Sequence, residues 1–183
     1  METVNGDQCQ IAWYEDGCRI AVIDASGHGE PAAKVAAMAI HALHQRPDLG
    51  PAEAISACHE TLQTTRGAAI SIAKIDLTHS VLSYAGLGNV EARVLQGETE
   101  TRLVTYRGIV GVVMRRVAVA QINLEPGWLF VMHSDGVNAR FVLNESLVTA
   151  VGGDCDRLAQ RLLSDWGRAE DDATVIAATA ATR

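Results

Sequence analysis

Short runs of apolar and β-branched residues, separated by polar turns, dominate the pattern along the chain. They predict β-strands over residues 9–14, 19–24, 68–76, 81–85, 90–95, 101–105, 117–124, 128–134 and 173–178. A 3.6-residue apolar period predicts helices over residues 30–46, 51–64 and 154–166. Many strands with a few grouped helices are typical of an α+β fold, not of strict βαβ alternation. With no internal repeat and no convincing boundary, we expect residues 1–183 to form a single domain.

The first two predicted strands form a hairpin that brings two carboxylates together. If Asp16-Gly17 is its two-residue loop, Asp24 faces Cys9, and Asp7 lies on the same face as a diagonal neighbour of Asp24. That places the two Cα atoms roughly 7–8 Å apart. Two bare carboxylates so close would repel each other, so the pattern indicates cations between them. Oxygen ligands select hard ions such as Mg²⁺ or Mn²⁺.

Two more aspartates stand where predicted strands end or begin. Strand 128–134 ends in Ser134-Asp135-Gly136, and Asp171-Asp172 lead into strand 173–178. The two sites meet if these strands pair antiparallel. Either sequence feature is common by itself, because Asp-Gly often forms a turn and acidic residues often flank strands. Four such aspartates together favour a two-metal site, in which ions about 3.5–4 Å apart activate a water molecule.

A glycine-rich loop, Asp24-Ala25-Ser26-Gly27-His28-Gly29, joins a buried strand to a helix. Its glycines permit a sharp turn and a close approach to a ligand, and the helix start favours an anion. Such loops are common, and this one alone indicates little.

Composition narrows the possible functions. The chain has 183 residues and a formal net charge of -7, with no basic stripe, which argues against nucleic-acid binding. Cys9, Cys18, Cys58 and Cys155 show no metal-site spacing, so we interpret them as isolated thiols. With no apolar run long enough for a membrane span and no basic, apolar leader, we expect a cytoplasmic soluble protein.

The ordered set of motifs resembles the metal-dependent protein phosphatases of the type 2C superfamily, and more closely their SpoIIE-type bacterial branch. The motifs are Gly6-Asp7, residues 23–29, His133-Ser134-Asp135-Gly136-Val137 and Asp171-Asp172-Ala173-Thr174-Val175-Ile176. Residues 66–69 and 85–89 are similar to small stand-alone members of the RsbX type, which serve the stressosome. The resemblance implies a four-layer αββα sandwich of two antiparallel sheets between helices.

The resemblance also implies a site. Two Mn²⁺ or Mg²⁺ ions would be held by Asp7, Asp24 as the bridge, the Ala25 carbonyl, Asp135 and Asp171. Asp24 and Asp135 would act in catalysis through the metal-bound water. Residues of the loop and outer shell would be Gly27, His28, Gly29 and Asp172.

The function implied is hydrolysis of phosphoserine or phosphothreonine on a STAS-domain scaffold or antagonist protein, with stress signalling as its context. One alternative is a catalytically silent binding module that docks a signalling partner, and another is a hydrolase of small phosphoesters. Ala25 stands where many members have glycine, which leaves the carbonyl ligand intact. Some relatives clamp the phosphate with an N-terminal arginine, but the first arginine here is Arg19, inside the hairpin, so the clamp is unassigned.

Several other residues have two interpretations. His28 is either a general acid or phosphate contact, or a packing residue of the glycine loop. His133 is best explained as a hydrogen-bonded strand residue, and Arg115 and Arg116 as a solvated pair, with an acidic partner or phosphopeptide as the alternative. Ser26 and Ser134 lack the nucleophile-elbow motif and are not expected to be nucleophiles.

Overall fold

A computed structural model describes residues 4–180 of the chain. Its elements in chain order are β1 (Asp7–Tyr14), β2 (Gly17–Ala25), α1 (Gly29–Gln45), α2 (Pro51–Leu62), β3 (Ala68–Asp76), β4 (Val81–Leu87), β5 (Glu91–Gln96), β6 (Thr99–Leu103), β7 (Ala120–Asn123), β8 (Leu129–His133), α3 (Glu145–Ala150), α4 (Cys155–Trp166) and β9 (Val175–Thr179). Each predicted strand and helix is present within a few residues of its predicted bounds.

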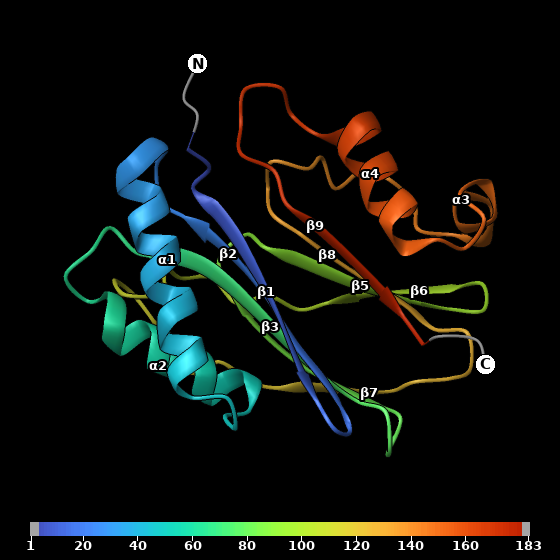
Figure 1. Ribbon diagram of the computed structural model, residues 1–183, viewed down its shortest axis with the longest axis horizontal. Helices are drawn as coiled ribbons and strands as arrows, with labels where there is room; N and C mark the ends of the chain where they lie inside the picture. Colours follow the sequence, from blue (N-terminus) through green and yellow to red (C-terminus); the bar gives the residue numbers. More distant parts are fainter. Residues whose placement is uncertain (1–3, 181–183) are drawn as a thin grey trace.

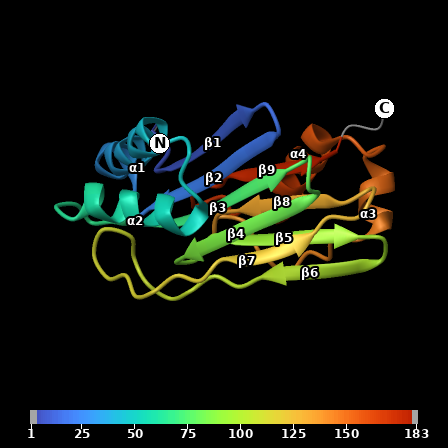
Figure 2. The same ribbon diagram turned by 90° about the horizontal axis from the view of Figure 1, so that it is seen from below.

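The strands form two antiparallel sheets, which overlap in the view of Figure 1. The first has the order β1-β2-β3-β4-β7 and the second the order β6-β5-β8-β9. Neighbours in both are antiparallel, so most connections are hairpins or short loops. Helices α1 and α2 contact the first sheet, and α4 contacts β9 of the second. Figure 2 shows α1 and α2 at one end of the molecule and α3 and α4 at the other.

Three clusters of buried apolar side chains lie between the layers of helices and sheets. Side chains of one face of the first sheet, such as Ile23 and Ile70, pack against α1 and α2. Those of its other face, such as Val22, meet Phe130 and other residues of the second sheet. The outer face of the second sheet packs against α4 through Leu158 and other apolar residues. The order helix, sheet, sheet, helix confirms the predicted αββα sandwich. It also explains why β2, buried on both faces, is mostly apolar, with Arg19 and Asp24 as its charged residues.

The register of the first hairpin differs from the prediction. Tyr14 pairs with Gly17, so the turn residues are Glu15 and Asp16, and Asp7 faces Asp24 directly. The reason lies on the other side of β2. A Cβ at Gly17 would lie 1.9 Å from the carbonyl oxygen of Ile75 in β3. Glycine is therefore needed there because a neighbouring strand approaches closely, not because the turn requires it.

Helix α3 was not predicted. It has only six residues, and none of them is fully buried. Its first turn is stabilised by Asn144, whose side-chain oxygen accepts a hydrogen bond from the Leu147 amide at 2.9 Å. One and a half turns are too short to display an apolar period, so the segment had no helical signature in the sequence.

No helix among residues 4–180 is both long enough and apolar enough to cross a membrane. The four cysteines form no disulfide; Cys18 and Cys58 are buried and Cys9 is exposed.

Candidate metal centre

Asp7 and Asp24 form the base of the candidate site. They are register partners across β1 and β2, so their side chains lie on the same face of the first sheet. That is the face toward the second sheet, because Val22 and Ile20, in phase with Asp24, belong to the cluster between the sheets. Direct partners have Cβ atoms about 4.5–5.5 Å apart, closer than the predicted diagonal arrangement. Asp7 is 6% exposed, so this pair is largely withdrawn from water.

Asp135 and Asp171 come to the same place from the second sheet. Strands β8 and β9 pair antiparallel, with His133 opposite Val175. Beyond the strands, Ser134 continues the pairing: its amide donates to the Thr174 carbonyl at 3.1 Å and its hydroxyl accepts from the Thr174 amide at 3.0 Å. The end of β8 and the segment before β9 are thereby held together, which brings Asp135 and Asp171 to one cavity.

That cavity has a volume of about 1010 Å³ and runs along the ends of both sheets. It is bordered by the glycine loop, the β4–β5 turn, a segment around Gly108, and the segments beside β8 and β9. Its lining contains Asp24, Ala25, Ser26, Gly27, His28, Ala69, Gly88, Asn89, Arg107, Gly108, Ile109, Asp135, Ala169, Glu170, Asp171 and Asp172. Two of the predicted site residues are not part of this lining. Asp7 is buried next to Asp24, and Gly29 is buried as the first residue of α1.

Burial and mutual repulsion make the paired carboxylates unusually basic. Burial raises the pKa of Asp7 to about 6, opposed by a hydrogen bond with Ser134 and reinforced by the charges of Asp172, Asp135 and Asp171. Burial, followed by the charge of Asp7, raises the pKa of Asp24 to about 8; Asp135 and Asp171 add to the effect. The charged cluster is therefore unfavourable without a counter-ion, and a bound cation would stabilise it.

The residues present fit a hard divalent cation. Oδ2 of Asp7 and Oδ2 of Asp24 are both buried and have no hydrogen-bond partner. A buried carboxylate oxygen without a partner is costly, and an ion would satisfy both. All the predicted donors are oxygen atoms, the ligands that Mg²⁺ and Mn²⁺ prefer. Among residues 4–180, however, no three His, Cys, Asp or Glu side chains stand in an arrangement that could hold an ion as it is.

Two contacts orient the acidic residues; the resemblance implied an outer-shell place for Asp172, but neither contact itself was predicted. Asn89, in the β4–β5 turn, donates from Nδ2 to Oδ2 of Asp135 at 2.6 Å. Asp172 accepts at Oδ2 from the Gly6 amide at 2.6 Å, and so holds the segment that carries Asp7. Gly6 and Asp172 both belong to the motifs quoted above, but nothing in the sequence shows that they meet. Asn89 is preceded by Gly88, whose φ of +112° suits glycine and whose Cβ would lie 2.3 Å from that of Ala69.

The glycine loop is shaped by an arginine. Gly27 has a φ of +96°, and a Cβ there would lie 2.3 Å from Nη1 of Arg66. The same nitrogen lies 3.4 Å from the Ser26 carbonyl oxygen, to which it donates. The Ser26 amide donates to Gly67 at 3.0 Å, so the loop is also tied to the start of β3 by its backbone. Gly27 suits this position by its positive φ, whereas the guanidinium against it is the end of a flexible side chain that can move aside.

Arg19 does not reach the cavity. It is buried at 1% exposure, and its guanidinium donates to the carbonyls of Leu43 at 2.8 Å and Arg46 at 3.0 Å, at the end of α1. A cation at a helix C-terminus satisfies free carbonyls and the helix dipole. Arg115 and Arg116 are exposed and outside the lining. The arginine that does line the cavity is Arg107, which sequence analysis did not single out.

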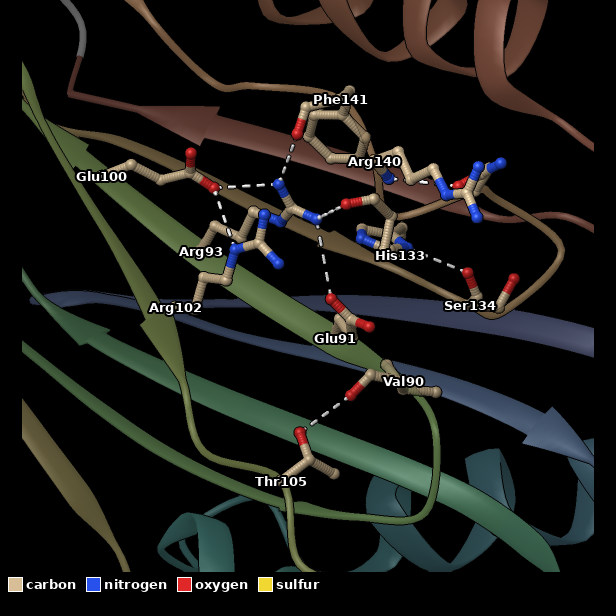
Figure 3. A network of polar contacts seen from close by, with 12 residues as sticks. Val90, Glu91, Arg93, Glu100, Arg102, Thr105, His133, Ser134, Arg140 and Phe141 are labelled. Carbon is tan, nitrogen blue, oxygen red and sulfur yellow. Dashed lines mark hydrogen bonds and ion pairs between the residues drawn. The ribbon is translucent and has the colours of Figure 1, made fainter.

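A second buried arginine supports the segment that follows Asp135 (Figure 3). Arg93 of β5 donates to the carbonyls of Phe141 at 2.8 Å and Ala139 at 2.7 Å, and pairs with Glu100 at 2.9 Å. Its guanidinium also lies 4.0 Å from the centre of the Phe141 ring. Figure 3 shows His133 beside this network, with Nδ1 bonded to the Ser134 carbonyl at 2.9 Å. His133 is thus a strand residue hydrogen-bonded through Nδ1 as expected, but its Nε2 is buried without a partner in the described part of the chain. Burial lowers the pKa of its imidazole.

The αββα sandwich, with an acidic cavity at the ends of its two sheets, is the fold of the PP2C-type protein phosphatases. The family model of Stage II sporulation protein E (SpoIIE) matches residues 14–181, and the chain belongs to this family. The match begins after Asp7, so the family assignment does not depend on that residue. No curated protein matches the chain.

Solved structures agree with this assignment. One, described as "The bacterial stressosome: a modular system that has been adapted to control secondary messenger signaling", is 28% identical with a TM-score of 0.90, over 97% of this chain and 93% of that one. RsbX in complex with magnesium is 21% identical with a TM-score of 0.84, over 96% and 87%. The PP2C domain of SpoIIE from Bacillus subtilis is 21% identical with a TM-score of 0.75, over 95% and 56%.

Proposed function

We propose that residues 1–183 form one metal-dependent phosphatase domain that hydrolyses phosphoserine or phosphothreonine on a protein. The observation that carries the proposal is that Asp24, Asp135 and Asp171 line one cavity, while Asp7 is buried opposite Asp24 and each of this pair has a carboxylate oxygen without a partner among the described residues. These four carboxylates and the Ala25 carbonyl would hold two Mn²⁺ or Mg²⁺ ions. Such ions supply an activated water and neutralise charge on a phosphoryl group in transit.

Residues of the protein support this chemistry in two ways: they orient the carboxylates, and they bind or supply protons. Asn89 orients Asp135, which lines the cavity, by its hydrogen bond to Oδ2. Burial and the charge of Asp7 raise the pKa of Asp24, so a cation held there would compete with a proton for this carboxylate. The alkoxide leaving group needs a proton from solvent or from a neighbouring group, and His28 lies in the cavity lining where it can serve.

We propose no covalent step on the protein, and no cysteine among residues 4–180 lines the cavity. Both cysteines buried near the core, Cys18 and Cys58, have a raised pKa because of burial, which disfavours their thiolates. Ser134 already accepts a hydrogen bond from the Thr174 amide beneath the site. Direct attack by water is therefore the route these residues support.

The substrate class is proposed from likeness to signalling proteins. A stressosome structure is similar to this chain over 97% of its length, and RsbX over 96%. Their likeness supports a phosphorylated STAS-domain scaffold or antagonist as substrate, and a place in cytoplasmic stress signalling. The open, 1010 Å³ cavity is large enough for a phosphorylated side chain with its flanking backbone.

The experiment that tests the proposal measures phosphate release from a phosphoserine-bearing STAS-domain protein. Release is followed with Mn²⁺ and with a chelator, for the wild type, Asp135→Asn and the exposed surface control Asp48→Asn. We expect release that requires Mn²⁺, is lost in Asp135→Asn and is unchanged in Asp48→Asn. No release by a folded protein that binds Mn²⁺ would instead support a silent binding module. A strong preference for a small aryl phosphate would contradict a protein substrate.

A further inference from the structure

The lining of the acidic cavity includes a positively charged side chain, Arg107, for which no role has been given so far. Its lining contains five carboxylates, from Asp24, Asp135, Glu170, Asp171 and Asp172. Among residues 4–180, Arg107 is the single lysine or arginine that lines it. A phosphoester substrate is itself an anion, so metal ions alone would have to attract it into a site of like charge. A fixed cation beside the ions would lower that electrostatic cost.

Arg107 is not engaged by another charge. The arginine ion pairs formed within residues 4–180 are those of Arg46, Arg93, Arg102, Arg157 and Arg161. Its side chain is exposed, and no hydrogen bond from it to another described residue is present. Although carboxylates line the same cavity, the guanidinium is paired with none of them. Its donors remain available for a ligand with oxygen acceptors.

The backbone on both sides of Arg107 is fixed, so this cation is held in place and does not lie on a loose loop. Tyr106 before it exchanges two hydrogen bonds with β4 and the turn beyond: its amide donates to Gly86 at 2.9 Å, and its carbonyl accepts from Gly88 at 2.9 Å. Gly108 after it is crowded, because a Cβ there would lie 2.6 Å from the Val113 carbonyl oxygen. A site built on a fixed backbone positions its donors better than a mobile loop does.

The next turn of the same segment is fixed as well. Val110 and Ala68 exchange hydrogen bonds of 2.9 and 3.1 Å, which attach the segment to the start of β3. The Gly111 amide donates to Nδ1 of His59 in α2 at 2.8 Å. The segment 106–113 therefore crosses the ends of the first sheet at the cavity mouth. Asn89, which orients Asp135, follows Gly88 in the turn to which Tyr106 is bonded.

We propose that Arg107 binds the phosphate group of the substrate, across the cavity from the metal-binding carboxylates. The inference rests on the proposed phosphatase function and names a substrate-binding residue for it. A planar guanidinium offers two parallel N–H donors to a phosphate, a geometry that lysine cannot reproduce. Arg107 thus fills the role that Arg19, buried at the end of α1, cannot fill.

A competing explanation is that Arg107 only offsets the charge of the carboxylates. The two explanations differ in what Arg107→Gln changes. Loss of a phosphate ligand weakens the binding of phosphate and of phosphoester. Loss of a neutralising charge instead tightens the binding of Mn²⁺ and leaves the binding of phosphate to the Mn²⁺-loaded protein unchanged.

The test compares wild type, Arg107→Gln, Arg107→Lys and the control Arg116→Gln, which makes the same charge change on the same connection outside the cavity. The measurements are Mn²⁺ affinity, inhibition by inorganic phosphate, calorimetric binding of phosphate to the Mn²⁺-loaded protein, and kcat and KM for a small aryl phosphate. We expect Arg107→Gln to weaken phosphate inhibition and kcat/KM about 10- to 100-fold. Arg107→Lys should recover part of this loss, and Arg116→Gln should match the wild type.

Each other outcome is decisive. Phosphate inhibition unchanged in Arg107→Gln, in an active enzyme, overturns the inference and leaves the phosphatase function intact. Equal losses in Arg107→Gln and Arg116→Gln also overturn it, because they would show a general charge effect. A wild type that binds Mn²⁺ but hydrolyses no ester contradicts the proposed function. Calorimetric binding of phosphate then tests Arg107 separately.

Discussion

Asp7 and Asp24 stand directly opposite each other in the β1–β2 ladder, both facing the second sheet. Like charges in this position destabilise a hairpin. Each has one buried oxygen without a partner. The pair is therefore a local cost to the fold, concentrated where the cavity opens, and such a cost is expected at a functional site.

Replacing Asp24 by asparagine separates stability from activity. Asp24→Asn removes a charge from the cluster but keeps the size of the side chain. We expect phosphatase activity to fall by more than about 100-fold, because the proposed metal site would lose one of its carboxylates. We expect the metal-free protein to be as stable as the wild type or more so. Chemical denaturation in chelator measures the second effect; marked unfolding would show that Asp24 is structural and not a ligand.

The pKa shifts predict an unusual pH dependence for the metal-free protein. The folded-state pKa values of Asp7 and Asp24, about 6 and about 8, are above the ordinary value of 3.8. The folded state therefore binds more protons than the unfolded state between pH 4 and 8, and stability increases as pH falls through that range. Between pH 8 and 7, above the ordinary range of histidine, we expect a gain of about 1 kcal/mol that Asp24→Asn lacks.

Metal binding should reverse that trend. A cation competes with the protons on these carboxylates, so its stabilising effect should increase with pH. At a hundredfold excess over its Kd, Mn²⁺ should add about 2.7 kcal/mol. Melting temperatures with Mn²⁺ and with chelator, at pH 7 and 8, give the comparison. A Mn²⁺ effect that is equal at both pH values would mean that the ion binds elsewhere.

Much of this architecture could be predicted, because the most deeply buried strands have the clearest pattern of apolar residues in the sequence. β2 and β3 are buried on both faces and appear in the sequence as long apolar runs. The aspartates at the ends of β2 and β8 were recognisable because a charge abruptly follows such a run. The antiparallel pairing of β8 with β9, which the sequence left as a condition, brings Asp135 and Asp171 to one cavity.

What could not be predicted depends on contacts between distant segments. The predicted hairpin register was wrong by one position on each strand. Glycine is needed at position 17 because β3, more than fifty residues away in sequence, packs closely against it. The hydrogen bond from Asn89 to Asp135 and the presence of Arg107 in the cavity both arise from loops. Loop residues have no periodic signature, so only the assembled fold shows which of them face the site.

Gly136 is expected to be essential for the spacing between the two acidic segments. A Cβ at this position would lie 1.9 Å from the carbonyl oxygen of Asp172, which is a backbone atom and cannot easily move away. Gly136→Ala should push the segment with Asp171 and Asp172 away from Asp135. Because small displacements in an active site are costly, we expect activity to fall about 100-fold. Mn²⁺ affinity, measured by calorimetry, should fall with it.

The control for that substitution is Gly97→Ala in the β5–β6 turn. Gly97 has a φ of +54°, and a Cβ added there would have no atom within 4 Å, so alanine costs only backbone strain, about 1 kcal/mol. Its activity and Mn²⁺ affinity should be those of the wild type. Equal Mn²⁺ affinity in Gly136→Ala would show that Asp171 and Asp135 do not share an ion.

The buried Arg93 should be a major determinant of stability. Arg93→Met leaves the carbonyls of Ala139 and Phe141, and the carboxylate of Glu100, without their donor. We expect a loss of about 3 kcal/mol in the free energy of unfolding. Arg102→Met, which removes an exposed arginine 3.6 Å from the same Glu100, should change it by less than about 0.5 kcal/mol. Similar losses in both variants would show that the charge of Glu100, and not the burial of Arg93, sets the effect.

His59 is expected to hold the segment that carries Arg107. Its Nδ1 accepts a hydrogen bond from the Gly111 amide at 2.8 Å, and Gly111 is buried against Leu62, so no water readily replaces that acceptor. His59→Ala should weaken the local structure by about 1–2 kcal/mol. Hydrogen exchange at residues 110–113 should become faster, while that of β8 stays unchanged. Because Arg107 would be less well positioned, KM for a phosphoester should rise more than kcat falls.

The matched control is His41→Ala, a substitution at an exposed position of α1. Faster exchange with an unchanged KM would mean that the segment can loosen without moving Arg107, and that its attachment to α2 serves stability alone.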